Sequence, residues 1–496
     1  MKKLMSILLA ILMLISILAS CGGNDETTTT EIPTTEQPTT EAPTTEIPTT
    51  EAPTTEAPKN TWSSKTDIRD TWSGKTLNVA CSAWYREGAP WAMPETFITE
   101  ENDADFGEKI QEAVLERNEF IEKTYGIKVN WINAANADMH KALEAATLAE
   151  NINYDLAAPR MMNVQSVVAG GYVYDLAGRE FIDFENTYYR DESIKTYTAH
   201  GHTFFVTGGF STLDIETSSV LFFNKDLLTE EETNDIYNMV RKGEWTFDKL
   251  VAYASDVYSD NVDKNNPHKY PYGVCLTSYS LLYNFFGVKQ TGVDSTTGKW
   301  EITIDDDRVD NIIDIIIDSR KSAWFADFGG YTDFVKNKLL FYNYEFVNSY
   351  VGERCNTGIV PFPMLNKEQG RYYVPCSMQK PVVMCIPKIT QDRNMSDYFM
   401  DVLCWTGEEY VVKAYIDEKM EMFRTKDERE MLTEYIIPNI SYDAGEVVGW
   451  GELISIKTKS YKDNENHFDE VYAEAEPDAL KIIAEWNAAW GGYTEE

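Results

Sequence analysis

The chain has 496 residues and carries 81 acidic against 44 basic side chains, which gives a formal net charge of −37. Such a charge repels nucleic acid and anionic membranes, so we expect neither as a partner. Residues 61–496 are rich in aliphatic and aromatic side chains, and this segment is longer than one hydrophobic core normally accommodates. We therefore expect a folded region with two lobes.

The N-terminus has the pattern of a secretory signal, because Lys2 and Lys3 precede an almost wholly apolar run over residues 4–19. The following Leu18-Ala19-Ser20-Cys21 resembles the lipobox of bacterial lipoproteins, in which the cysteine receives a lipid. The alternative is an ordinary signal peptide with a chance cysteine. We expect a signal peptide over residues 1–20 and a lipid on Cys21, which would be the protein's one attachment to the outer face of the bacterial cytoplasmic membrane.

A spacer follows the cysteine. Residues 29–58 are six copies of Thr-Thr-Glu-X-Pro, a composition that favours extended polyproline II and cannot bury a core. At about 3.1 Å per residue, such a stalk would reach roughly 90 Å. The sequence predicts a disordered stalk over residues 21–60, and its threonines are possible sites of glycosylation.

The other cysteines show no close CxxC pairs and no metal-ligand spacing with histidines. A chain of this size does not need disulfides, so buried thiols and disulfides both remain open. These residues are Cys81, Cys275, Cys355, Cys376, Cys385 and Cys404.

Strands and helices alternate in the first part of the folded region. "KTLNVAC" at 75–81 indicates a buried strand, and the apolar spacing of Ile110, Val114 and Ile121 predicts a helix that Gly126 ends. A strand near 127–132, a second helix and the strand "YDLAAP" complete a β-α-β-α-β order, which favours a mostly parallel sheet. "TWSGKT" is no P-loop, because it precedes the strand and lacks the first glycine.

The alternation continues in the second part. "WTFDKLVAYASDV" at 245–257 predicts a helix capped by Thr246, and Val309, Ile312 and Ile316 form the apolar stripe of another. The acidic cluster at 305–307 does not have the spacing of an EF-hand, so we interpret it as the first turn of that second helix.

Taken in chain order, several segments resemble the family 1 extracellular solute-binding proteins, which deliver sugars to ABC importers. They are the lipobox, "TLNVAC", "LERNEFIEKTYGIKVN", "YDLAAPR", "SSVLFFNKDLL", "WTFDKLVAYASDV" and "GIVPFPML", and together they extend over most of residues 75–450. The chain departs from the family pattern in its length, an insert around 85–105 and an acidic extension past about 450.

The resemblance implies a fold and its division. It implies the α/β fold of type II periplasmic binding proteins, in which two lobes with mostly parallel sheets are joined by hinge crossings. The matching segments place lobe 1 at 61–200 and 340–380, and lobe 2 at 201–339 and 381–496. They place the crossings near 198–210 and 338–345, with a return near 374–386.

A sugar site needs flat aromatic faces and fixed polar groups, and in open α/β sheets a ligand lies at the carboxyl ends of the strands. We therefore expect the ligand to contact residues that follow strands or stand at crossings. The candidates are Trp84, Tyr85, Trp91, Arg160, Met161, Phe210, Ser211, Tyr344, Glu345 and Trp450.

The resemblance implies a monomeric receptor that captures a carbohydrate and presents it to the transmembrane subunits of an ABC permease, with no catalytic residues, no cofactor and no metal. Two alternatives stay open, a stalked surface adhesin that binds glycans and a glycoside hydrolase with paired carboxylates. His200 and His202, separated by one glycine, are interpreted as structural and not as metal ligands.

Overall fold

The computed structural model describes residues 70–82, 108–135, 139–149, 152–261, 272–276, 282–304, 307–326, 330–377, 380–447, 459–460 and 462–495. All of them fall within Ala57–Glu496, which forms one compact unit. The predicted signal peptide, Cys21 and the stalk lie outside these residues. Among the helices of the described part, none is both long and apolar enough to cross a membrane.

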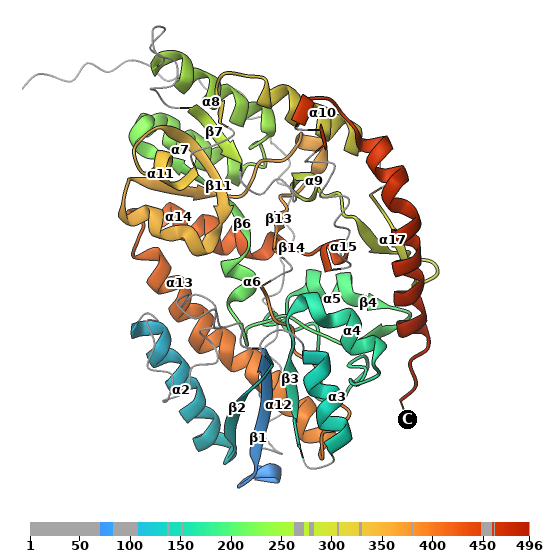
Figure 1. Ribbon diagram of the computed structural model, residues 1–496. Helices are drawn as coiled ribbons and strands as arrows, with labels where there is room; N and C mark the ends of the chain where they lie inside the picture. Colours follow the sequence, from blue (N-terminus) through green and yellow to red (C-terminus); the bar gives the residue numbers. More distant parts are fainter. Residues whose placement is uncertain are drawn as a thin grey trace, which may run out of the picture. The chain divides into compact units, whose positions relative to one another are not determined.

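The first lobe is built on the parallel sheet β2-β1-β3 (Figure 1). The predicted helical stripe is confirmed, since Ile110, Val114 and Ile121 are all buried. Gly126 follows α2 with a positive φ, a conformation that favours glycine. The elements of this lobe are β1 (Thr76–Ser82), α2 (Glu108–Tyr125), β2 (Lys128–Ala135), α3 (Met139–Ala149), β3 (Leu156–Ala158), η5 (Met161–Asn163), α4 (Val164–Ala169), α5 (Asp191–Tyr197), β4 (Thr198–Ala199), β5 (His202–Thr203) and α12 (Arg393–Thr406).

The second lobe is built on the five-stranded sheet β10-β7-β11-β6-β12 (Figure 1). Strands β10, β7 and β11 are parallel, but β6 runs antiparallel to both β11 and β12, so this sheet is more mixed than predicted. Its strands are β6 (Ser219–Asn224), β7 (Tyr272–Leu276), β10 (Phe325–Ala326), β11 (Leu339–Glu345) and β12 (Thr357–Val360). Around it lie α7 (Glu230–Arg241), α8 (Phe247–Asn261), α9 (Leu282–Phe285), β8 (Thr291–Val293), β9 (Trp300–Ile302), α10 (Arg308–Arg320), α11 (Gly330–Phe334), η9 (Phe346–Glu353) and α14 (Lys426–Glu430).

The predicted lobe boundaries are wrong in the middle of the chain. Residues 338–345 were expected to cross between lobes, but β11 pairs with β6 and β7 inside the second sheet. Residues 382–386 instead belong to the first lobe, because Val382 and Cys385 bridge to the end of β3 and Met384 bridges to Val206. The prediction failed because a buried strand and a crossing strand have the same apolar composition.

Among the described residues, three stretches connect the lobes. The first runs over 207–218 and contains α6 (Leu213–Glu216), somewhat later than predicted. The second leaves β13 (Val374–Pro375) and reaches 382, in agreement with the predicted return. The third includes η11 (Gly407–Val412), α13 (Lys413–Met420), η12 (Met431–Ile436), β14 (Ile440–Ser441) and α15 (Ala444–Val447), with β14 paired to β13.

The first and third connections approach each other at Gly209 and Gly407. A β-carbon on Gly209 would lie 2.3 Å from the carbonyl oxygen of Cys404 and 2.4 Å from the amide nitrogen of Glu408. A β-carbon on Gly407 would likewise lie 2.1 Å from the carbonyl oxygen of Gly209. Only glycine permits this backbone contact, which sets how closely the first connection packs on the end of α12.

The chain ends in α17 (Phe468–Gly491), which contacts both lobes (Figure 1). On the second lobe it packs against β9, where the ring of Trp300 lies 4.9 Å from that of Trp486. On the first lobe it packs against α4, and Trp490 lies 5.5 Å from Phe204. The C-terminal extension noted in the sequence is therefore a part of the fold that joins the two lobes.

Candidate functional site

The candidate site lies where the second sheet ends and the connections between the lobes begin. Strand β11 ends at Glu345 and continues directly into η9. Helix α6 of the first connection packs against η9, and α15 of the third connection packs against η5 at the end of β3. The carboxyl ends of strands from both lobes therefore meet the connections here, which is where an open α/β sheet holds a ligand.

An aromatic wall on the second lobe consists of Tyr331, Tyr344 and Tyr350. Tyr344 at the end of β11 stacks on Tyr342, with ring centroids 5.6 Å apart and planes at 13°. Tyr331 of α11 and Tyr350 of η9 have ring centroids 5.2 Å apart. Tyr350 is 40% exposed, and its pKa is raised by burial and by the nearby Tyr331 and Tyr344. Partly exposed rings of this kind suit the C–H faces of a sugar.

Charged groups stand beside this wall. The ammonium of Lys380, in the second connection, lies 2.5 Å from a carboxylate oxygen of Glu345. Glu216 at the end of α6 is only 6% exposed and accepts a hydrogen bond of 2.5 Å from the hydroxyl of Thr212. Burial raises the pKa of Glu216, while that hydrogen bond and the charges of Lys419 and Lys380 oppose the rise. Lys380 thus pairs with Glu345, and its charge also acts on Glu216 of the first connection.

A buried ion-pair cluster fixes the base of the connections. Arg190 donates to Asp214 at 2.9 Å and pairs with Glu408 at 3.2 Å, so it links the first lobe to α6 and to η11. The hydroxyl of Tyr442, in the third connection, donates to Asp214 at 3.2 Å. Burial lowers the pKa of Arg190, but the charges of Glu408 and Asp214 raise it by more. These partners keep the arginine charged and hold all three segments together.

Next to this cluster is a small pocket lined by residues of the second lobe and of the second and third connections. The buried carboxylate of Asp443 accepts hydrogen bonds from the side chain of Asn284 and from the backbone amides of Gln290 and Gly445. This carboxylate therefore ties the third connection to the loop after α9. The lining residues are Asn284, Gly287, Lys289, Tyr373, Pro375, Cys376, Ser441, Tyr442 and Asp443.

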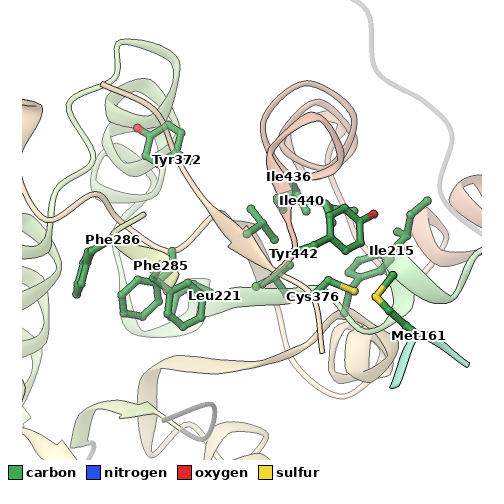
Figure 2. Close-up of a cluster of buried hydrophobic side chains, with 14 of the residues drawn as sticks. Met161, Ile215, Leu221, Phe285, Phe286, Tyr372, Cys376, Ile436, Ile440 and Tyr442 are labelled. Atoms are coloured by element: carbon green, nitrogen blue, oxygen red, sulfur yellow. The ribbon is translucent and has the colours of Figure 1, made fainter. Parts of the chain in front are cut away.

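Four of the predicted ligand contacts lie at or near the site, and their side chains differ in how far they are exposed to solvent. Tyr344 and Glu345 are partly exposed beside the aromatic wall. Arg160 is 7% exposed at the end of β3, and Met161 is fully buried among Ile215, Cys376 and Tyr442 (Figure 2). Met161 therefore packs the core between the lobes and offers no face to a ligand.

The remaining predicted contacts lie elsewhere. Phe210 and Ser211 are buried, with Phe210 in the first-lobe core and the Ser211 hydroxyl accepting a hydrogen bond from the amide of Leu213. The expectation that they face a ligand is not met, because the first connection turns them into the core. Trp84, Tyr85, Trp91 and Trp450 lie outside the described residues.

Four residues of the site were missed in the sequence. Tyr331 and Tyr350 belong to short helices that follow strands β10 and β11, so the rule that selected Tyr344 applies to them as well. Lys380 stands in the predicted return segment and Glu216 in the first connection, but only the tertiary structure brings them together. Sequence spacing carries no signal for that electrostatic interaction.

The histidine and cysteine predictions can also be placed. His200 lies 2.8 Å from the side-chain oxygen of Asn487, and His202 lies 2.7 Å from Asp175, so the two rings reach different partners as expected of structural residues. All six described cysteines are buried, and Cys81, Cys355, Cys385 and Cys404 form no disulfide.

No family model matches the chain, and no curated protein matches it either. Solved structures do match. An extracellular solute-binding protein from Staphylococcus aureus in complex with maltose has a TM-score of 0.53 at 13% identity, over 82% of this chain and 98% of that one. The cyclic alpha-maltosyl-1,6-maltose binding protein from Arthrobacter globiformis has a TM-score of 0.51 at 12% identity, over 84% and 99%. The chain thus has the two-lobed α/β fold of the extracellular solute-binding proteins.

Proposed function

We propose that the protein is a receptor that captures a carbohydrate for an ABC importer. The observation that carries this proposal is the wall of Tyr331, Tyr344 and Tyr350 beside the Glu345–Lys380 pair, at the strand ends of a two-lobed fold. Aromatic faces and fixed charged hydrogen-bonding groups are the two elements that sugar recognition requires. The similar structures named above bind maltose and a cyclic maltosyl-maltose, and both are carbohydrates.

Binding in such a receptor needs no chemical step. The sugar stacks on the tyrosines of the second lobe and hydrogen-bonds to Glu345 and Lys380. The first lobe then closes on it, because contacts from both lobes favour the closed state over the open one. The permease distinguishes the two states, and only the loaded receptor releases sugar to it. The lipid on Cys21 and the stalk would keep this domain near the permease, and the domain itself acts as a monomer.

A thermal-shift screen of the purified protein tests the proposal. Maltose, maltotriose and a cyclic maltosyl-maltose are the first probes, with other neutral oligosaccharides after them. A ligand at about a hundred times its dissociation constant should stabilise the protein by about 2.7 kcal/mol. Replacing Tyr344 with alanine should weaken binding about fivefold or more, since an aromatic contact of this kind contributes about 1 kcal/mol.

A matched control and a product assay sharpen the result. Tyr472→Ala removes a partly buried tyrosine from α17, away from the wall, and should leave affinity unchanged. Release of shorter sugars in the same wells would favour the glycoside hydrolase. Binding of a surface glycan with no sugar uptake by cells would favour the adhesin. Absence of any stabilisation across the panel would refute the carbohydrate proposal.

A further inference from the structure

The pair of Glu345 and Lys380 has the chemistry to determine which sugars the site accepts. The two charged atoms are 2.5 Å apart, and the side chains are 17% and 31% exposed respectively. An ammonium group offers three donors and a carboxylate offers only acceptors, so the pair presents both kinds of group side by side. Each hydroxyl of a sugar both donates and accepts, and two neighbouring hydroxyls match such a pair.

The charges around the pair leave little room for an anion. Lys380 faces Glu345 directly and contributes to the field at Glu216, while Arg190 is shared by Asp214 and Glu408. Arg190 is therefore paired with two carboxylates, and Lys380 is paired with Glu345. Lys419, whose charge also acts on Glu216, is paired with Glu418. A sugar carboxylate at this position would compete with Glu345 for Lys380. It would also be repelled by the charges of Glu345 and Glu216.

In the described part of the first lobe, the cation at the end of β3 does little to offset this charge. Arg160 is a cation at the end of β3, but it is only 7% exposed, and burial lowers its pKa. Over the whole chain the charge is −37, which adds a long-range repulsion of anions.

We propose that the ligand is an uncharged sugar whose neighbouring hydroxyls bind Glu345 and Lys380, and that Glu345 is the residue that excludes acidic sugars. The inference rests on the proposed carbohydrate function and narrows it to a substrate class. Specificity of this kind comes from a repulsive group as much as from attractive ones.

Calorimetric titration of the purified protein with size-matched trisaccharides provides the test. One set is neutral (malto-, cello-, xylo- and mannotriose), and the other consists of trigalacturonate and triguluronate. The tightest neutral sugar should bind at least about tenfold more tightly than either acidic one. An acidic sugar that binds tightest would overturn this inference and leave the carbohydrate function intact, whereas no binding in either set would count against the function itself.

Variants identify the residue responsible. Glu345→Gln preserves the shape of the side chain and removes its charge, so the preference for neutral over acidic sugars should fall at least about tenfold. Glu244→Gln is the matched control, since it breaks another Lys–Glu pair, that with Lys367 at 2.8 Å, on a more exposed part of the surface. It should not change the preference.

A second variant covers the case in which Glu345→Gln does not fold. Lys380→Gln keeps the charges of Glu345 and Glu216. It should weaken the binding of neutral sugars and should not strengthen the binding of acidic ones. A preference that stays within about twofold of the wild type in Glu345→Gln would overturn the role of Glu345. So would an acidic sugar that binds wild type and loses its affinity in Arg160→Gln, because the first lobe would then supply an anion site.

Discussion

Asn487 of α17 joins a hairpin of the second lobe to a turn of the first. Its side-chain oxygen accepts a hydrogen bond of 2.9 Å from the amide of Trp300 and lies 2.8 Å from the ring nitrogen of His200. Its side-chain nitrogen donates to the carbonyl of Trp300 at 2.9 Å. The amide of His200 also donates to the carbonyl of Gly298, so the turn and the hairpin meet directly.

Replacing Asn487 with alanine removes all three side-chain contacts. A hydrogen bond contributes about 1 kcal/mol net, and the backbone of Trp300 is left without these partners, so we expect a loss of about 2–3 kcal/mol in the free energy of unfolding. The rings of Trp486 and Trp490 still pack against Trp300, and for that reason α17 should stay docked.

Urea denaturation followed by tryptophan fluorescence measures this change. Glu485→Ala, at an exposed position of the same helix, is the control and should stay within about 0.5 kcal/mol of the wild type. If Asn487→Ala were as stable as that control, the idea that this side chain joins the lobes would be refuted.

Three further outcomes follow from buried groups. Because burial raises the pKa of Glu216, this residue stabilises the folded state at low pH, and that contribution to the free energy of unfolding is lost as the pH rises from about 4.5 through the raised pKa. In urea titrations Glu216→Gln should therefore gain stability relative to the wild type between about pH 4 and 7. A difference that does not depend on pH would contradict this. Gly209→Ala should destabilise by about 3 kcal/mol or more, because its β-carbon would meet backbone atoms, and a neutral effect on thermal unfolding would show that α12 shifts freely. Glu428→Ala leaves the buried Lys225 without its carboxylate and should cost about 3–5 kcal/mol, whereas a loss below 1 kcal/mol would mean that water reaches the lysine.

The fold was largely predictable because periodicity reports which face of an element is buried. The stripes of α2, α8 and α10 follow directly from residues such as Val114, Leu250 and Ile312. The assignment of β11 failed, since a strand such as "LLFYNYE" is apolar whether it crosses between lobes or lies in the middle of a sheet.

The site was predictable only in part. Tyr344 and Glu345 follow a strand, and that position is visible in the sequence. The partner of Glu345 is 35 residues away, and the charge of the same lysine also acts on Glu216 in another connection. Such contacts depend on how three separate connections fold against one another, and no local pattern encodes them.

Hydrogen exchange with and without a saturating neutral oligosaccharide tests the central claim most directly. If the site lies between the lobes at the edge of the second sheet, protection should increase in three places, namely the end of β11 with η9, residues 212–216, and the stretch around Lys380. Protection confined to the outer helices, such as α7 or α10, with no change at these three places, would contradict the account.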